Sequence, residues 1–269
     1  MRSARYIAVG MVGAVLALTA AARRAAPPLN DLDLRVVVNL PAYRLDALVG
    51  DTVIATMRVA VGMSRYPTPR GDFEITSIDW NPRWVPPPSP WAAKERTMGP
   101  GPNNPMGRVK LNFRPLYFLH GTPFEQSIGS AASHGCIRLH NEDAIALALL
   151  VQRFGAPRLT PAASEAYAAD TVSRSVVLDL PVPITLRYDL VERVADSIRV
   201  YPDIYHLSTI GLREEVRRAL ARAGLDTQLI DEARLRAFVA RLGTSGRAAL
   251  IETLLRDPRD FSDRESGAR

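Results

Sequence analysis

Cysteine is nearly absent from this sequence, which has one such residue, Cys136, in 269. A single cysteine cannot form an internal disulfide, and structural zinc sites usually draw on several cysteines or on paired histidines. Runs of like charge are also missing, because the 34 basic and 28 acidic residues are scattered along the chain. With no basic stripe that carries interleaved aromatic residues, we expect no nucleic-acid partner.

The N-terminal segment is apolar and uncharged over residues 6–22, with arginines before it and three alanines at its end. This order is typical of an export signal, so residues 1–26 are expected to be a signal peptide or, if uncleaved, a membrane anchor. We expect an exported protein, in the periplasm or on the envelope face of the cytoplasmic membrane, with membrane contact only through this segment. A free thiol outside the cytoplasm is a hazard unless it is used.

Short β-rich runs follow from residue 34 onward. Pro41 and Gly50-Asp51 separate the first three runs, which favours hairpins and a predominantly antiparallel, mainly β core. The expected strands cover residues 34–40, 43–48, 53–61, 73–78, 109–113, 117–119, 175–180, 184–188 and 197–200. An irregular stretch at 80–107 contains all three tryptophans, and its length predicts a lid loop.

Helices are expected in two places. Asn141 can cap one helix that follows the cysteine and ends near Gly155. Beyond Leu212 the apolar spacing predicts helices over 235–242 and 250–255. We therefore expect a catalytic domain at 34–206, a helical C-terminal extension at 207–257 and a flexible tail at 258–269. The helices of the extension pack on the β core or on one another, or they bind a protein partner.

The single cysteine lies in the run Ser133-His134-Gly135-Cys136-Ile137-Arg138. A thiol is mostly protonated at neutral pH, so a nucleophilic cysteine needs a nearby base or cation. His120 ends a strand and can approach the thiol while its other ring nitrogen bonds a backbone carbonyl such as that of Gly121. We therefore predict Cys136 as the nucleophile and His120 as the general base and later the general acid.

The residues around Cys136 suggest supporting roles. The amides of Gly135 and Cys136 can donate to the oxyanion of a tetrahedral intermediate, and Arg138 can pair with a substrate carboxylate or support the thiolate. His134 shapes the pocket or contacts substrate, and Ser133 either bonds a histidine or is a plain turn residue. The competing chemistry is a zinc site made from His120, His134, Cys136 and His140.

These residues resemble the signature of the YkuD type of L,D-transpeptidases, cysteine enzymes that cross-link bacterial peptidoglycan. The resemblance extends to a TPxGxF-like turn, an NPxG-like turn, a Tyr-x-x-His-Gly-Thr segment and the beginning of the lid of exported members. These segments are Thr68 to Phe73, Asn104 to Gly107, Tyr117 to Thr122 and Trp84 to Ser89. Val182 to Tyr188, with Asp203 to Tyr205, is similar to the strand extension of the larger periplasmic branch.

The resemblance implies a β-sandwich or barrel-like catalytic domain of the YkuD type. Cys136 would attack the bond between the third-position diamino acid and D-alanine in a tetrapeptide stem, release D-alanine, and pass the acyl group to an amine of another stem. Donor and acceptor stems are the implied partners, Tyr117 a substrate-pocket residue, and Arg138 a substrate-side residue. No metal or organic cofactor is implied.

Several alternatives stay open at this point. The same thioester could pass to water or to a protein lysine, which would make the protein an L,D-carboxypeptidase or a wall-protein anchoring or releasing enzyme. A non-catalytic peptidoglycan-binding protein and the zinc site are the alternatives from other classes.

Overall fold

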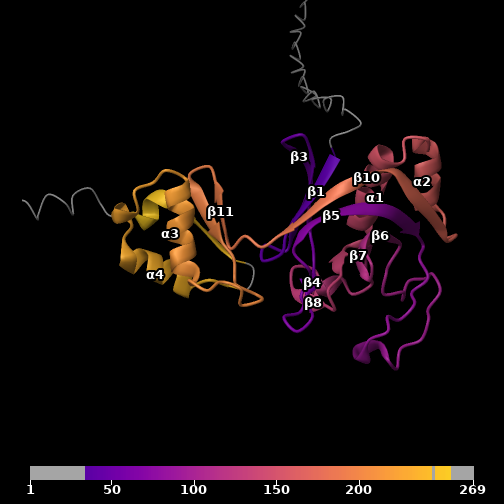
Figure 1. Cartoon of the computed structure of the whole chain (residues 1–269), viewed down its shortest axis with the longest axis horizontal. Helices are drawn as coiled ribbons and strands as arrows, with labels where there is room; N and C mark the ends of the chain where they lie inside the picture. The colour runs from indigo at the N-terminus through magenta and orange to yellow at the C-terminus, as the bar shows by residue number, and fades with distance from the viewer. Residues whose placement is uncertain (1–33, 244–245, 256–269) are drawn as a thin grey trace, which may run out of the picture.

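The computed structural model describes residues 34–243 and 246–255, and Figure 1 shows the chain as a ribbon. The expected export segment at 1–26 and the expected tail at 258–269 lie outside these ranges. Within them, no helix combines the length and apolar character that crossing a membrane requires.

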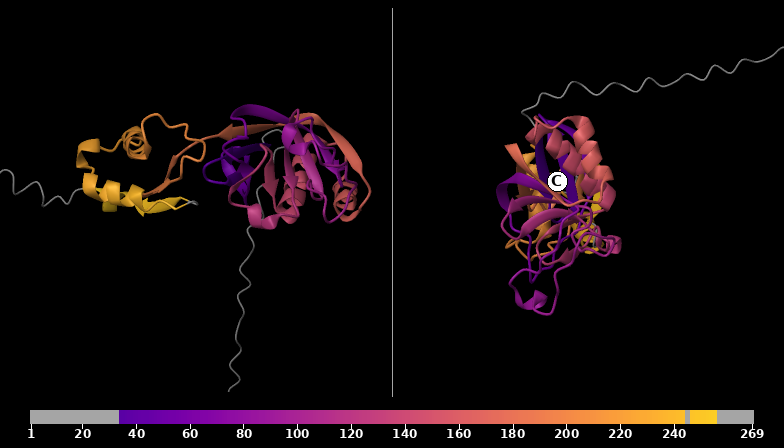
Figure 2. Two further views of the ribbon diagram at one scale, coloured as in Figure 1. Left: turned by 90° about the horizontal axis from the view of Figure 1, so that it is seen from below. Right: turned by 90° about the vertical axis from the view of Figure 1, so that its right-hand side faces the viewer.

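Eight strands form the main sheet, in the order β3-β2-β1-β10-β5-β6-β7-β9. The alternating pattern of β1 buries every second side chain, and the sheet curves into the expected barrel-like, mainly β form (Figure 2). The bounds are β1 Leu34–Asn39, β2 Arg44–Val49, β3 Thr52–Arg58, β5 Gly71–Trp80, β6 Val109–Arg114, β7 Tyr117–Gly121, β9 Ile137–Leu139 and β10 Arg174–Arg187.

The sheet is mixed, although antiparallel pairs predominate as expected. β1 pairs with β10 in parallel, and β7 pairs with β9 in parallel. Between β7 and β9 the chain passes through the short helix η2 (Glu125–Ser127) and strand β8 (Ala131–Ser133), which pairs with β4 (Val61–Gly62) in a separate small sheet. This excursion returns the chain in the direction of β7, so β9 adds to the sheet edge in parallel.

Helix α1 (Asn141–Gly155) packs on β6, β7 and β10 and was expected at this place. The expected cap was wrong by one position, because His140 is the N-cap and Asn141 is the first helical residue. Helix α2 (Pro161–Ala169) was not expected; Thr160 caps it by accepting from the Ala163 amide. Buried Gln152 accepts from the Trp80 indole and donates to Ser164, which joins β5, α1 and α2.

The lid projects away from the sheet between β5 and β6 (Figure 1). It contains the short helix η1 (Pro90–Ala92) and a backbone bridge between Trp84 and Met98. Asn104 stabilises the base of this loop, since its side chain donates to the carbonyls of Pro82 and Gly99 and accepts from the Met106 amide. These bonds make the stretch an ordered loop with its own internal contacts.

A second hydrophobic cluster forms around β11, β12 and the C-terminal elements, and we call this part the C-terminal unit. The helical expectation holds for α3 and α4, but the helix expected over 250–255 was wrong: residues 247–250 pair with β12 as a strand and a 3-10 turn follows. The unit comprises β11 Val191–Val194, β12 Ser197–Val200, α3 Leu212–Arg222, η3 Thr227–Leu229, α4 Glu232–Ala240, β13 Arg247–Leu250 and η4 Ile251–Leu254. It therefore begins within the expected catalytic domain, before residue 207.

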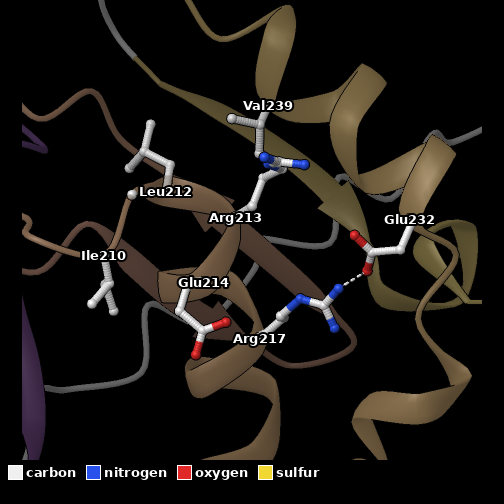
Figure 3. Close-up of a pocket in the computed structure, with 8 residues that line it drawn as sticks. Ile210, Leu212, Arg213, Glu214, Arg217, Glu232 and Val239 are labelled. Atoms are coloured by element: carbon white, nitrogen blue, oxygen red, sulfur yellow. Dashed lines mark hydrogen bonds and ion pairs between the residues drawn. The ribbon is translucent and has the colours of Figure 1, made fainter.

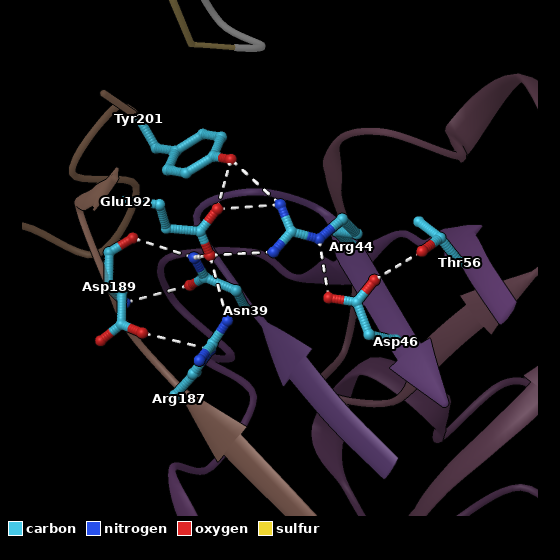
Figure 4. Close-up of polar contacts among 8 residues, drawn as sticks. All are labelled: Asn39, Arg44, Asp46, Thr56, Arg187, Asp189, Glu192 and Tyr201. Atoms are coloured by element: carbon cyan, nitrogen blue, oxygen red, sulfur yellow. Dashed lines mark hydrogen bonds and ion pairs between the residues drawn. The ribbon is translucent and has the colours of Figure 1, made fainter. Parts of the chain in front are cut away.

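A polar network joins the C-terminal unit to the edge of the main sheet (Figure 4). The Glu192 carboxylate accepts from Arg44 at 2.8 and 3.0 Å, from Asn39 at 2.9 Å and from Arg187 at 3.1 Å. Tyr201 donates to the same carboxylate at 2.8 Å. The bonds from Arg44, Tyr201 and Asn39 outweigh burial and lower the pKa of Glu192.

We expect Glu192→Gln to destabilise the protein by about 2–3 kcal/mol at pH 7, because Arg44 and Arg187 lose a charged partner in a mostly buried place. A carboxyl whose pKa is lowered by folding contributes stability above its unfolded pKa and loses it as pH falls through the folded pKa. The difference between wild type and variant should therefore shrink as the pH is taken from 7 to 3. Urea unfolding at each pH measures it.

The matched control is Glu74→Gln, an exposed carboxylate on β5. Surface substitutions of this kind change stability by about 0.5 kcal/mol or less. A difference for Glu192→Gln that stays constant down to pH 3 would contradict this account of the network.

Candidate active site

Cross-strand pairing brings the predicted site residues to one row. His120 on β7 pairs with Arg138 on β9, and on the other side His120 pairs with Lys110 on β6. Directly paired residues of neighbouring strands project from the same face of a sheet. Cys136 lies two residues before Arg138, next to the beginning of β9. The register therefore gathers a thiol, an imidazole and two cations on one side of the sheet.

The His120 ring is buried, and its Nδ1 lies 2.6 Å from the Gly121 carbonyl, as expected from the sequence. Because a carbonyl only accepts, Nδ1 carries the proton in this bond and Nε2 is the nitrogen that can accept one. Burial and, to a smaller extent, the charges of Arg138 and Lys110 lower the pKa of His120 to about 4, against the raising effect of the Gly121 carbonyl. The imidazole is therefore neutral at pH 7.

Cys136 is partly exposed, and its Sγ lies 3.6 Å from the Leu116 carbonyl. Loss of water around the sulfur raises the pKa of the thiol to about 11, although the Phe118 amide, Arg138 and Lys110 all favour the thiolate. The His120 pKa lies far below that of the thiol, so the proton stays on sulfur at rest. The pair is a neutral thiol beside a neutral base.

The turn before Cys136 is held by hydroxyl groups. Ser133 is buried; its Oγ accepts from the Gly135 amide at 3.1 Å and donates to the Cys136 carbonyl at 2.5 Å. Thr68 Oγ1 donates to the Gly135 carbonyl at 2.9 Å. Gly135 has a φ of +111°, and a Cβ there would lie 2.8 Å from the Tyr117 ring. Only glycine suits this position.

The structure decides one sequence-based role and corrects another. Of the two roles left open for Ser133, it shows the turn residue, because Ser133 bonds the backbone of its own turn and not a histidine. The Gly135 amide, expected as an oxyanion donor, is already bonded to Ser133 Oγ. In the described part of the chain the Cys136 amide has no hydrogen-bond partner. Of the two amides expected as oxyanion donors, that of Cys136 is therefore the one free to donate.

The two cations of the row differ in their partners. Lys110 pairs with Asp79 at 2.9 Å. Arg138 is partly buried, and burial lowers the pKa of its guanidinium. No carboxylate of residues 34–243 or 246–255 forms an ion pair with Arg138; its guanidinium lies 5.8 Å from the centre of the Phe124 ring. Arg138 thus offers a charge beside the thiol that no acid of the described chain neutralises.

His134 belongs to the lid side of the site. Its ring stacks on Trp91 of η1, with centroids 3.9 Å apart and planes at 14°, and lies 4.9 Å from the Tyr66 ring. Burial, together with Arg138 and Arg65, lowers the pKa of His134. A neutral imidazole stacks well between aromatic rings, so His134 connects the nucleophile turn to the lid.

Sequence reasoning assigned no role in the site to Lys110, Asn141 and Trp91, although Asn141 was expected as a helix cap. Asn141 Oδ1 accepts from the Arg108 amide at 3.0 Å, and its Nδ2 donates to the Thr122 carbonyl at 3.1 Å. A Cβ on Gly121 would lie 2.2 Å from this Oδ1, so the strand end that carries His120 packs directly on the start of α1. The sequence shows the NPxG-like turn and the HGT segment as motifs. It does not show that both contact Asn141, because that contact forms only in the folded chain.

A separate pocket of about 490 Å³ lies in the C-terminal unit between the start of α3 and the start of α4 (Figure 3). Arg217 of α3 and Glu232 of α4 form an ion pair at its wall, and Ile210 and Val239 contribute apolar surface. None of the residues of the Cys136 site lines it. No group of three or more histidine, cysteine or acidic side chains in the described chain is arranged to hold a metal ion.

Comparison with known proteins identifies the family. The family model of the YkuD L,D-transpeptidase catalytic domain matches residues 33–178. The L,D-transpeptidase YqjB of Bacillus subtilis (strain 168) is 31% identical over 121 residues. The match covers 43% of this chain and 64% of YqjB. YkuD of Bacillus licheniformis is 32% identical over 133 residues, or 49% of this chain and 68% of that protein.

A solved structure, an L,D-transpeptidase from Mycobacterium smegmatis, aligns with a TM-score of 0.38 at 17% identity over 58% of each chain. This chain belongs to the YkuD family of L,D-transpeptidase catalytic domains.

The protonation states in the site predict the pH dependence of thiol alkylation. With the pKa of Cys136 near 11, the rate constant for iodoacetamide should keep rising up to about pH 10, whereas an unperturbed thiol with a pKa of about 8.5 reaches its plateau earlier. Arg138→Leu should move the curve to higher pH, because it removes a charge that favours the thiolate. Intact mass at timed intervals measures the rate.

Arg153→Leu, at an exposed position of α1, is the matched control and should leave the curve in place. A plateau below pH 8 in the wild-type protein would show a resting thiolate and contradict the neutral pair.

Proposed function

We propose that the protein is a cysteine-dependent L,D-transpeptidase that acts on peptidoglycan tetrapeptide stems. The proposal rests above all on one observation: Cys136, neutral His120 and Arg138 share one face of the β7–β9 edge, in a chain of the YkuD family. The donor is the peptide bond between the third-position diamino acid and the fourth-position D-alanine. The enzyme class is acyl transfer through a thioester.

The first half of the reaction forms the thioester. Cys136 Sγ attacks the carbonyl carbon while its proton passes to Nε2 of His120, since Nδ1 is held by the Gly121 carbonyl. The Cys136 amide and the nearby cations stabilise the tetrahedral oxyanion. The C–N bond then breaks, His120 returns the proton to the leaving amine, and D-alanine departs.

The second half transfers the acyl group. An amine of another stem attacks the thioester and gives a proton to His120, and the thiol is restored as the new amide forms. This step cross-links two third-position residues. If water attacks instead, the product is a tripeptide stem, and a protein lysine as acceptor would anchor a protein to the wall.

Substrate contacts follow from charge and position. Stem peptides carry free carboxylates, and a guanidinium pairs with a carboxylate in two-point geometry, so Arg138 is suited to bind one of them. Tyr117 packs against Gly135 and so borders the nucleophile turn. His134 and Trp91 close the site from the lid side. Peptidoglycan lies outside the cytoplasmic membrane, which agrees with the proposed export of the protein.

Incubation with tetrapeptide muropeptides tests the proposal. Wild-type protein should release D-alanine and give cross-linked dimers, read by mass spectrometry, because the thioester passes to a second stem. Cys136→Ala should give neither product. His120→Asn should lower the rate by about 100-fold or more, since general acid–base catalysis is worth about 10²–10⁴.

The matched control is His206→Asn, an exposed histidine with a positive φ that asparagine tolerates. It should keep full activity. Tripeptides without dimers would favour the carboxypeptidase, and no product from the folded wild-type protein would contradict the proposed function.

A further inference from the structure

The peptide unit between Gly135 and Cys136 has one end bound and one end free. Its carbonyl, on Gly135, accepts from Thr68 Oγ1 at 2.9 Å, and its amide, on Cys136, has no partner in the described chain. In a planar trans peptide the C=O and N–H groups point in opposite directions. The bond from Thr68 therefore sets the direction in which the Cys136 N–H points.

Thr68 is itself held on two sides. Its side chain is buried; Oγ1 accepts from the Gly62 amide at 2.8 Å, and its own amide donates to the Tyr205 hydroxyl at 3.2 Å. The same Tyr205 hydroxyl donates to the Gly62 carbonyl at 2.9 Å. The Tyr205 hydroxyl thus bonds the backbone of Thr68 and also that of Gly62, whose amide holds the Thr68 side chain.

Tyr205 is fixed from behind by Tyr188 and Asp203. The Tyr205 amide donates to the Tyr188 hydroxyl at 2.7 Å, and that hydroxyl donates to the Asp203 carboxylate at 2.7 Å. The two tyrosine rings stack with centroids 5.4 Å apart. All three residues lie beyond residue 178, where the match to the family model ends.

We propose that Thr68 and Tyr205 are positioning residues that aim the Cys136 amide at the oxyanion of the acylation step. The chain of bonds runs from Tyr205 to Thr68 and from Thr68 to the Gly135 carbonyl. Neither residue touches the reacting atoms, so both act through the peptide. This inference rests on the proposed function, because the oxyanion arises only in acyl transfer.

Two reactions of the same thiol separate this role from general support of the fold. Acylation by the carbapenem imipenem proceeds through addition to a carbonyl and develops an oxyanion. Alkylation by iodoacetamide is a displacement at carbon and develops none. Loss of the amide's direction should therefore slow acylation and spare alkylation, whereas a disturbed thiol or a loosened fold should change both rates.

Thr68→Val keeps the shape of the side chain and removes its hydroxyl. We expect its imipenem acylation rate to fall by about 10–100-fold, below the full effect of removing an oxyanion donor, while alkylation stays within about twofold. Thr68→Ser restores the hydroxyl and should restore acylation to within about threefold of wild type. Tyr205→Phe should lower acylation by about three- to tenfold, because the Thr68 amide then loses its partner and the Gly62 amide alone holds the Thr68 hydroxyl that bonds Gly135.

The matched control is Tyr201→Phe. It also removes a buried tyrosine hydroxyl, but that hydroxyl bonds Glu192 and Arg44 in the network at the C-terminal unit. Even if Tyr201→Phe loses as much stability as Tyr205→Phe, its rates of acylation and alkylation should both stay at the wild-type value. If Thr68→Val does not fold, the ratio of the two rates in Tyr205→Phe decides the question.

Four results would count against the inference. Thr68→Val and Tyr205→Phe could acylate at the wild-type rate, or lose acylation and alkylation in equal proportion; either result refutes positioning and leaves the proposed function intact. If folded wild-type protein forms no imipenem adduct, or Cys136→Ala forms one, the proposed function fails and this inference fails with it.

Discussion

The parallel pairing of β7 with β9 is the constraint on which the site depends. It sets His120 opposite Arg138, and the antiparallel pairing of β7 with β6 sets His120 opposite Lys110. A slip of one residue in either ladder would turn the paired side chains to opposite faces. The close packing of Gly107 and Gly121 on Asn141 prevents such a slip, because any larger residue there would separate α1 from the end of β7.

The electrostatics of the row favour a protected nucleophile. Burial, with the charges of Arg138 and Lys110, keeps His120 neutral. The same two charges would stabilise a thiolate, yet loss of water keeps the proton on Cys136 at rest. A neutral thiol reacts slowly with oxidants and disulfides. In the exported protein that we propose, this resting state would limit damage to the lone thiol. Reactivity would then arise when a substrate brings its carbonyl to the sulfur and His120 takes the proton.

The sequence predicted most of the strands, helix α1, the lid and the central site residues, because each carries a local signal. Alternation marks strands, and the SHGC and HGT segments mark the nucleophile turn and its histidine. The helix predicted from apolar spacing at residues 250–255 was wrong, because pairing with β12 overrides the helical pattern there. Contacts between segments far apart in the sequence gave no local signal: the cation at Lys110 and the bond from Thr68 to Gly135.

Residues 188–205 serve two structures at once. Tyr188 and Tyr205 bond toward Thr68 and the nucleophile turn, while Glu192 and Tyr201 bond toward Arg44 at the other edge of the sheet. Tyr188 and Tyr205 thus support the buried backbone near Thr68, whereas Glu192 and Tyr201 bind the C-terminal unit to the main sheet. A segment shared in this way cannot shift at one end without straining the bonds at the other. The geometry of the Cys136 turn is therefore linked physically to a part of the chain that lies beyond the catalytic domain matched by the family.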